Sequence, residues 1–200
     1  MIQTFHIQSA KTDEQIKDIA NLAEIIWNQH FTPIIGKEQV DYMVEKFQSY
    51  PAIKNQITKD GYEYFEIFCD NTLAGYTGIH AEAQALFLSK LYIHPDFRGR
   101  HLATKAFQYL IDICKERGLK KIWLTCNKHN DNTLKIYDHL GLQITDSQVA
   151  DIGNDSVLLE CKLTAHRNNE LIALLKSKFK MIEVVRGGAV AIESISTSCR

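Results

Sequence analysis

The sequence is poor in the features that mark membrane-bound or secreted proteins. No apolar run comes near the roughly 20 residues that cross a bilayer. Its first residues, MIQTFHIQSAKTDEQ, lack the basic and then apolar pattern of a secretion signal. We therefore expect a protein of the cytoplasm that makes no use of a membrane.

The chain also lacks an excess of charge of either sign. Its 23 lysines and arginines nearly balance 24 aspartates and glutamates, so that the net charge is −1. Such a chain has no strong overall field to attract the phosphate backbone of nucleic acid. We expect no nucleic-acid partner.

Cysteine is scarce and scattered. The 5 cysteines are odd in number and contain no C-x-x-C pair, which argues against a disulfide framework and against a zinc site. We expect them to be small buried apolar residues in a reducing compartment, and we expect no metal.

The sequence does contain regular helical and strand patterns in a globular composition, with 45% hydrophobic and 24% charged residues. A capping box of Thr12 and Gln15 begins the first helix, which Pro33 and Gly36 are expected to interrupt. Further helices are predicted over residues 37–49, 101–118 and 130–141, with a short helical turn after Pro51. Strands are predicted over residues 4–10, 62–70, 73–83, 85–95, 120–127 and 156–163.

This order, a meander of strands followed by a β-α-β unit, predicts an α/β (α+β) fold. We expect a mixed, mostly antiparallel sheet with helices on both faces. Residues 1–164 form the predicted domain, and residues 165–200 follow it as a predicted helix and hairpin. Two interpretations of this tail stay open: an ordered addition that covers a sheet edge or mediates a homodimer, or a weakly ordered extension.

Two arginines flank a glycine where the third strand of the meander runs into a long helix, in HPDFRGRHLATKAF. A helix N-terminus offers unpaired N–H groups and a partial positive charge, so it suits an anion. Gly99 permits a positive φ, and Arg98 and Arg100 add cationic donors. The pattern indicates either a pyrophosphate site or a solvated basic turn.

A second group of polar residues follows the strand KKIWLTC. Ligands of parallel strand pairs bind beyond the carboxyl ends of the strands, and this segment ends such a strand. Asn130 either caps the next helix or binds a ligand. Tyr137 lies about two turns further along that helix and is either a packing residue or a functional phenol.

Both stretches resemble motifs of one family. LYIHPDFRGRHLATKAF is similar to the acyl-CoA-binding motif of GNAT-type N-acetyltransferases, which is R-x-x-G-x-G/A after a strand. NDNTLKIYDHLGL resembles the motif that follows it in this family, N-x-x-A-x-x-x-Y-x-x-x-G-F. The matching positions of the second motif are Asn130, Thr133, Tyr137, Gly141 and Leu142. The resemblance covers residues 4–164.

The resemblance implies an enzyme that transfers the acetyl group of acetyl-CoA to a primary amine. The pyrophosphate would lie on backbone amides from Arg98 to Ala103, and the pantetheine along the backbone of Leu91 and Ile93, where an N–H group polarises the thioester carbonyl. Tyr137 is the implied catalytic acid for the leaving thiolate. The implied cofactor-binding residues are Leu91, Tyr92, Ile93, Arg98, Gly99, Arg100, His101, Leu102, Ala103, Asn130 and Thr133.

Two positions depart from the family pattern. His101 stands where the motif has its first glycine, and we expect it to be tolerated if φ is negative there. Phe87 and Leu88 stand where some relatives place a glutamate that acts as general base. The remaining candidates for the base, each with a surface or strand-end role as the alternative, are His80, Glu82 and His94.

The motifs do not specify the acceptor amine. We expect a small-molecule amine, polyamine-like by the motif spacing, with a protein N-terminus or lysine as the alternative. Trp27 and His30 either line the amine side or pack in the core. A non-catalytic acyl-CoA-binding sensor also stays open, because the strand glutamate is missing, although Tyr137 argues against it.

Overall fold

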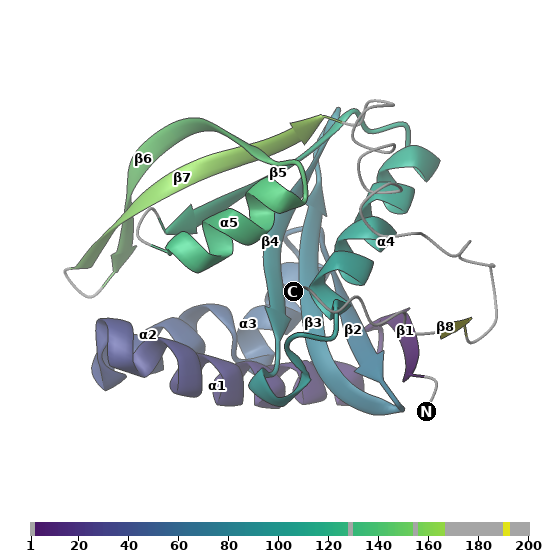
Figure 1. Cartoon of the computed structure of the whole chain (residues 1–200). Coiled ribbons are helices and arrows are strands. Elements are labelled where there is room, and N and C mark those ends of the chain that lie inside the picture. Colours follow the sequence, from purple (N-terminus) through teal and green to yellow (C-terminus); the bar gives the residue numbers. More distant parts are fainter. Residues whose placement is uncertain (1–2, 128–129, 154–155, 167–189, 193–200) are drawn as a thin grey trace, which may run out of the picture.

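The protein folds around one mixed sheet, described here from a computed structural model that covers residues 3–127, 130–153, 156–166 and 190–192 (Figure 1). The strand order is β6-β7-β5-β4-β3-β2-β1-β8. Every neighbouring pair is antiparallel except β4 and β5. The strands are β1 (Gln3–Ser9), β2 (Tyr62–Cys69), β3 (Thr72–Ala81), β4 (Ala85–Ile93), β5 (Lys121–Asn127), β6 (Gln143–Gly153), β7 (Ser156–His166) and β8 (Val190–Ile192). The predicted mixed, mostly antiparallel sheet is confirmed.

Helices cover both faces of this sheet, as predicted. The helices are α1 (Asp13–Ile35), α2 (Lys37–Phe47), α3 (Tyr50–Thr58), α4 (Leu102–Glu116) and α5 (Asp131–His139), with a short 3₁₀ turn, η1, at Pro95–Phe97. Tyr64 of β2 packs with α1 and α3, whereas the next residue, Phe65, packs with α4. Adjacent strand residues point to opposite faces, so α1 and α3 lie on one face and α4 on the other.

The first helix begins as the sequence predicts and ends later. Thr12 Oγ1 accepts from the N–H of Gln15 at 3.2 Å, and Gln15 Oε1 accepts from the N–H of Thr12 at 3.1 Å. The expectation that Pro33 interrupts the helix was wrong. Pro33 removes one backbone donor only near the C-terminus, and α1 ends two residues later, before Gly36, whose φ is 84°.

Two other elements were under-predicted. The helical turn expected after Pro51 is the full helix α3, capped by the Ser49 hydroxyl, which accepts from the N–H of Ala52. Strand β6 was not predicted at all, because its apolar residues do not mark a buried face: Ile144 is 59% exposed and Val149 is 64% exposed. It is an edge strand of the sheet, paired only with β7 among the described strands.

Of residues 165–200, the structure describes Ala165 and His166, which end β7, and β8, which pairs antiparallel with β1 through Val190 and Phe5. The helix predicted in this tail lies outside the described residues, and the boundary at residues 164 and 165 stays a prediction. No helix in the described part of the chain is long and apolar enough to span a membrane.

Strand β4 lies so close to Gly75 of β3 that it leaves no room for a side chain at this position. A Cβ at Gly75 would press on the carbonyl oxygen of Tyr92 and lie 2.7 Å from Cδ1 of Ile93. Gly75→Ala should therefore lower the free energy of unfolding by about 1–3 kcal/mol. Urea unfolding measures this, with Thr72→Ala at an exposed position of β3 as the control. Equal stability of the two variants would contradict the packing described here.

Candidate functional site

The central feature of the sheet is the divergence of β4 from β5. The two parallel strands pair only at Ala85–Phe87 with Lys121–Trp123. β4 continues to Ile93 against β3, and β5 continues to Asn127 against β7. From Leu88 onward, the β5 side of β4 is therefore without a partner strand among the described residues.

The backbone groups on this open side can be assigned from the register of β3 and β4. The N–H of His94 donates to the carbonyl of Ala74 at 2.8 Å, so the backbone N–H of His94 points toward β3. In an antiparallel strand, the backbone groups of alternate residues point toward the same neighbouring strand. The backbone groups of Tyr92 therefore point toward β3, and those of Leu91 and Ile93 point toward the open side. A backbone edge of this kind can pair with an extended ligand.

A β-bulge lies where β4 begins to diverge. Gly78 pairs with Lys90 and Ile79 pairs with Leu88, which leaves Ser89 as the extra residue of β4. A bulge bends its strand and increases the local twist, so this one re-aims the last residues of β4 away from β5. It thereby separates the paired half of β4 from the open half.

The glycine turn and the start of α4 follow directly after the open edge. Gly99 has a φ of 75°, and no atom would lie within 4 Å of an added Cβ. The first backbone hydrogen bond of α4 runs from the N–H of Lys105 to the carbonyl of His101, and within the described residues no side chain caps the helix. The N–H groups of the first turn are thus oriented for an anion.

His101 departs from the expected conformation. Its φ is 58° and its ψ is 20°, in the left-handed region, so the expectation of a negative φ was wrong. The turn needs a left-handed residue immediately before α4, which explains why glycine would suit this position. Histidine is one of the few non-glycine residues that adopt this region with some frequency.

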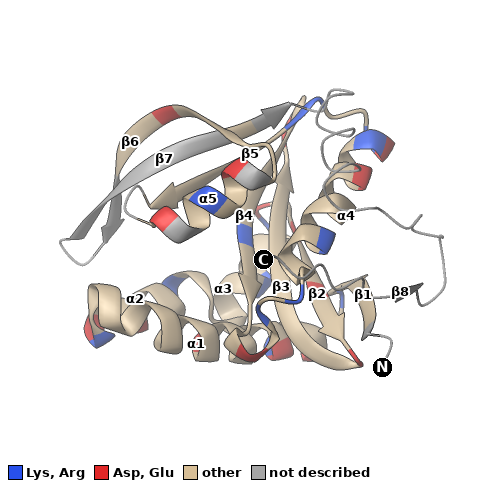
Figure 2. Ribbon diagram, in the orientation of Figure 1, with Lys and Arg blue, Asp and Glu red and all other residues tan. Residues whose placement is uncertain are grey.

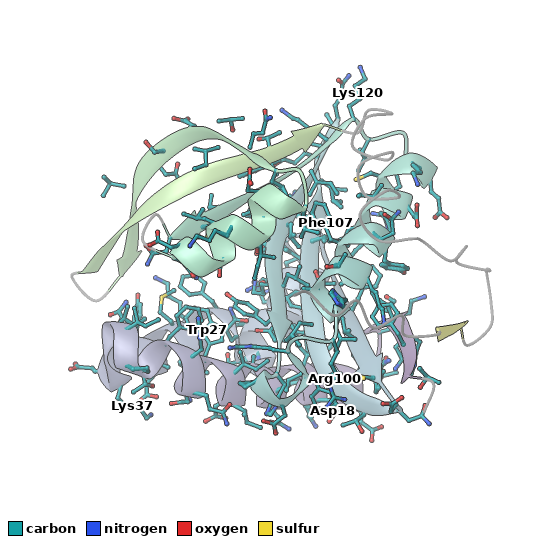
Figure 3. The ribbon with its side chains drawn as sticks, in the orientation of Figure 1. Asp18, Trp27, Lys37, Arg100, Phe107 and Lys120 are labelled. Atoms are coloured by element: carbon teal, nitrogen blue, oxygen red, sulfur yellow. The ribbon has the colours of Figure 1, made fainter. Side chains whose placement is uncertain are left out.

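The two arginines of the turn donate hydrogen bonds to backbone carbonyls at and just before the turn. Arg98 Nε donates to the carbonyl of Ile93 at 3.2 Å, and Arg100 Nη2 donates to the carbonyl of Asp96 at 3.3 Å. The Arg100 guanidinium also lies over the Phe97 ring at 5.1 Å. Figure 2 shows positive charge at this end of β4, and Figure 3 labels Arg100 there. The arginines therefore add charge to a turn that they also stabilise.

Helix α5 brings the second motif to the side of β5. Asn130 caps this helix, since its Oδ1 accepts from the N–H of Thr133 at 3.3 Å. Tyr137 is half-buried against the main core cluster. Burial, together with the neighbouring Cys126 and Tyr92, raises the pKa of Tyr137 above its ordinary value. Its phenol therefore keeps its proton at neutral pH. The two neighbours that influence it are Tyr92 of β4 and Cys126 of β5.

A group of aromatic rings connects α1 to the open end of β4. Tyr92 lies 5.9 Å from Trp27, 6.4 Å from Phe31 and 5.4 Å from Tyr76, measured between ring centroids. Figure 3 shows Trp27 on the side of α1 that faces α5. Burial and the charge of Arg98 lower the pKa of His30, which favours its neutral form. Trp27 and His30 thus lie near the site, and Trp27 is a core residue.

Two of the candidate bases lie far along the strands from this site. His80 of β3 pairs with Phe87 at the paired end of β4, and its ring lies 5.1 Å from that of Tyr62. Glu82 accepts from Trp123 Nε1 at 3.0 Å at the same end. His94 alone of the three follows the open edge, and its Nδ1 accepts from the N–H of Asp96 at 3.3 Å. Within the described residues, no group of His, Cys, Asp and Glu could hold a metal ion.

Lys90 is the residue of this region that sequence reasoning missed. It is 7% exposed, and its Nζ donates to Gln56 Oε1 at 3.0 Å and to Ser89 Oγ at 3.2 Å. The one available signal was a lysine inside the apolar strand ALFLSKLYI, where a charged residue needs a buried partner. Burial lowers the pKa of Lys90 to about 8.

The fold and this site define the class of protein to which the chain belongs. A mixed sheet with two diverging parallel strands leads directly from the open edge of β4 into a glycine turn and the start of α4. The sequence profile of the acetyltransferase (GNAT) family matches residues 20–142, more than half of the chain. The chain is therefore a member of the GNAT acetyltransferase family, as the resemblance predicted. A shorter match relates residues 140–195 to the small subunit of acetolactate synthase.

Individual relatives are distant. A Bacillus subtilis protein provisionally named as a ribosomal protein bS18-alanine N-acetyltransferase is 27% identical over 99 residues, which are 48% of this chain and 66% of that protein. A spermidine N(1)-acetyltransferase of Thermoplasma acidophilum is 20% identical over 143 residues, 68% of this chain and 89% of that protein. The chain thus spans slightly less than two thirds of the first of these relatives.

Solved structures share the fold. The PaiA N-acetyltransferase of Thermoplasma acidophilum, solved in complex with coenzyme A, matches with a TM-score of 0.66 and 17% identity over 79% of this chain and 97% of that one. A GCN5-related N-acetyltransferase from Rhodopseudomonas palustris matches with a TM-score of 0.68 and 16% identity over 83% and 98%. At these identities the likeness concerns the fold.

The lowered pKa of Lys90 predicts a dependence of stability on pH. The ordinary value of 10.5 applies to the unfolded chain, which therefore binds one more proton than the folded chain between about pH 8 and 10.5. The free energy of unfolding should rise with pH across this window, by about 3 kcal/mol for this one group. Lys90→Met should remove this rise, as urea unfolding at several pH values will show.

Lys46→Met is the matched control for this measurement. Lys46 is also a cation over an aromatic ring, 5.0 Å from the centroid of Tyr42, but it is exposed. Lys46→Met should show the same dependence of the free energy of unfolding on pH as the wild type. Parallel stability profiles for the wild type and Lys90→Met would contradict the shifted pKa.

Proposed function

We propose that this protein transfers the acetyl group of acetyl-CoA to a primary amine. The observation that carries this proposal is the open backbone edge of β4, which runs directly into the glycine turn and the start of α4. An acyl-CoA has an extended, amide-containing pantetheine arm joined to a pyrophosphate. These two parts match the two parts of the site in order and in chemistry.

The binding roles follow from this arrangement. The N–H groups from Arg98 to Ala103 hold the pyrophosphate, with the positive end of α4 behind them. The carbonyl of Leu91 and the N–H of Ile93 pair with the pantetheine amides, since the carbonyl of Ile93 already accepts from Arg98 Nε. Room at Gly99, where an added Cβ would meet no atom, lets a phosphate approach the backbone closely.

The transfer requires that one bond forms, one breaks and one proton moves. The acceptor nitrogen bonds to the acetyl carbon, the bond between that carbon and sulfur breaks, and one proton passes in net from the nitrogen to the sulfur. The N–H of Leu91 stabilises the developing charge on the carbonyl oxygen, an effect worth about 3 kcal/mol in related chemistry. Tyr137, protonated at neutral pH, donates to the departing sulfur.

The acceptor must reach the thioester uncharged, and an alkylammonium has a pKa of about 10.4. His94, at the open end of β4, is the candidate base whose position fits best. A small-molecule amine is the acceptor that we propose, with a polyamine as the first to test. A protein N-terminus is the second candidate, because one relative carries the name of an alanine N-acetyltransferase and another that of a spermidine acetyltransferase.

A thiol-release assay with a panel of amines tests the proposal. The panel contains spermidine, an alanyl peptide and a lysine-containing peptide with a blocked N-terminus. Release of CoA that depends on one of these amines supports an enzyme and names its acceptor class. Tight binding of acetyl-CoA without CoA release from any amine would instead support a sensor and overturn the proposal.

Gly99→Asp should weaken acetyl-CoA binding. The carboxylate would lie beside the pyrophosphate, so we expect the Kd to rise roughly tenfold or more, equal to at least about 1.4 kcal/mol. Isothermal titration calorimetry measures the change. Gly99→Asn is the matched control, because asparagine has the same size, tolerates a positive φ and carries no charge. Equal effects of the two variants would overturn the assignment of the pyrophosphate.

Tyr137→Phe should lower kcat by about a hundredfold, because the departing sulfur loses its proton donor. The Kd for acetyl-CoA should stay within about twofold, since the ring is retained. Steady-state kinetics and calorimetry separate the two effects. Tyr109→Phe is the control, at a phenol whose ring packs on Phe65 at 5.5 Å. Full activity of Tyr137→Phe would remove Tyr137 as the acid.

A further inference from the structure

We propose that Lys90 is a positioning residue for catalysis, which holds the β4 bulge so that the N–H of Leu91 points at the thioester carbonyl. This inference rests on the proposed function and extends it to a residue that touches neither substrate. Its basis is the place of Lys90, directly before Leu91 and at the bulge where β4 leaves β5.

The side chain of Lys90 ties the bulge to α3 and β2. Its Nζ donates to Gln56 Oε1 of α3 at 3.0 Å and to the hydroxyl of Ser89, the extra residue of the bulge, at 3.2 Å. The same Nζ lies 5.6 Å from the Tyr62 ring centroid and 5.3 Å from that of Tyr64. A buried cation therefore connects three elements at one point.

The backbone of Lys90 is held as well. The buried hydroxyl of Thr77 donates to the carbonyl of Lys90 at 2.7 Å. Gly78 leaves the space that the side chain crosses, since an added Cβ would lie 3.2 Å from the Tyr64 ring and 3.5 Å from Cβ of Lys90. Tyr64 closes the network by donating to Gln56 Oε1 at 2.6 Å. Each of these contacts restricts the bulge to one conformation.

Within the part of the chain that the structure describes, no anion lies close to the charge of Lys90. Among the described carboxylates, none lies within 4 Å of Nζ, and its partners Gln56 and Ser89 are neutral. In a buried site a positive charge acts over a longer range than it would in water. It therefore also favours the negative charge that develops beside Leu91 during transfer.

This arrangement makes catalysis sensitive to the protonation of Lys90. Burial lowers the pKa of this lysine to about 8, so the cation is present below that pH and is lost as pH rises through it. The groups packed around it stay neutral: burial raises the pKa values of Tyr62 and Tyr64, and Gln56 does not titrate. The remaining titratable groups, Asp60, His80 and Glu82, contact or influence Tyr62 rather than Nζ.

Two variants and one control test the role. Lys90→Met keeps the length of the side chain and removes its charge and hydrogen bonds, so kcat at pH 7 should fall roughly tenfold, while the Kd for acetyl-CoA stays within about twofold. Gln56→Glu places a carboxylate beside Nζ and should raise the pKa of Lys90. Lys54→Met is the control on α3, at a half-exposed lysine that lies over the Tyr50 ring and pairs with Asp13.

The decisive quantity is the ratio of kcat between wild type and Lys90→Met as a function of pH, because the ionisation of the acceptor amine cancels in it. We expect this ratio to fall above about pH 8, where the charge is lost, and to level off above one, because the neutral amine can still donate to Gln56 and Ser89. The ratio of kcat between Gln56→Glu and Lys90→Met should fall as well, at a pH that is higher by about one unit or more. Lys54→Met should follow the wild type throughout.

The outcomes separate this inference from the proposed function. If the wild type turns over but its kcat ratio to Lys90→Met stays constant with pH, the role of Lys90 alone is overturned. The same holds if the ratio falls at the same pH for Gln56→Glu as for the wild type. A loss of acetyl-CoA binding in Lys90→Met also overturns it, because the variant would then have lost the site as a whole. Absence of CoA release by the wild type with every amine overturns both proposals.

Discussion

The structure depends on one constraint: two parallel strands in the middle of a sheet pair at three positions and then separate. Backbone N–H and C=O groups in a protein interior need partners, so an unpaired stretch of a central strand is costly unless a ligand completes it. The divergence of β4 from β5 creates such a stretch at Leu91 and at the N–H of Ile93, whose carbonyl accepts from Arg98 Nε. The glycine turn, α4, α5 and the aromatic residues of α1 all contact or flank this opening.

Each surrounding element supplies what a bare strand edge lacks. The start of α4 adds oriented N–H groups and a positive partial charge, and α5 adds a phenol whose pKa is raised by burial. Trp27 and Phe31 of α1 and Tyr76 of β3 pack against Tyr92. They hold the end of β4 on the face of the sheet that α1 covers. The bulge at Ser89, held through Lys90, determines where the opening begins.

Sequence reasoning predicted the parts of this site that are encoded locally. The capping box of Thr12, the amphipathic α4 and the cap at Asn130 are decided by residues close together in the chain. Strand β6 could not be predicted because Ile144 and Val149 are exposed, so burial leaves no alternation to read. The left-handed φ of His101 had a local signal, the glycine that the family motif has at this position. The main partner of Lys90, Gln56, is distant in sequence, and no local pattern encodes their contact.

Amide hydrogen exchange at single residues of β4 shows directly whether the open edge of this strand binds acetyl-CoA. If the edge of β4 pairs with the pantetheine, acetyl-CoA should slow exchange at Leu91 and Ile93 by about tenfold or more. Exchange at Tyr92, whose N–H already faces β3, should change little. Unchanged exchange at Leu91 and Ile93 in the presence of saturating acetyl-CoA, or slowing at Tyr92 alone, would contradict the account.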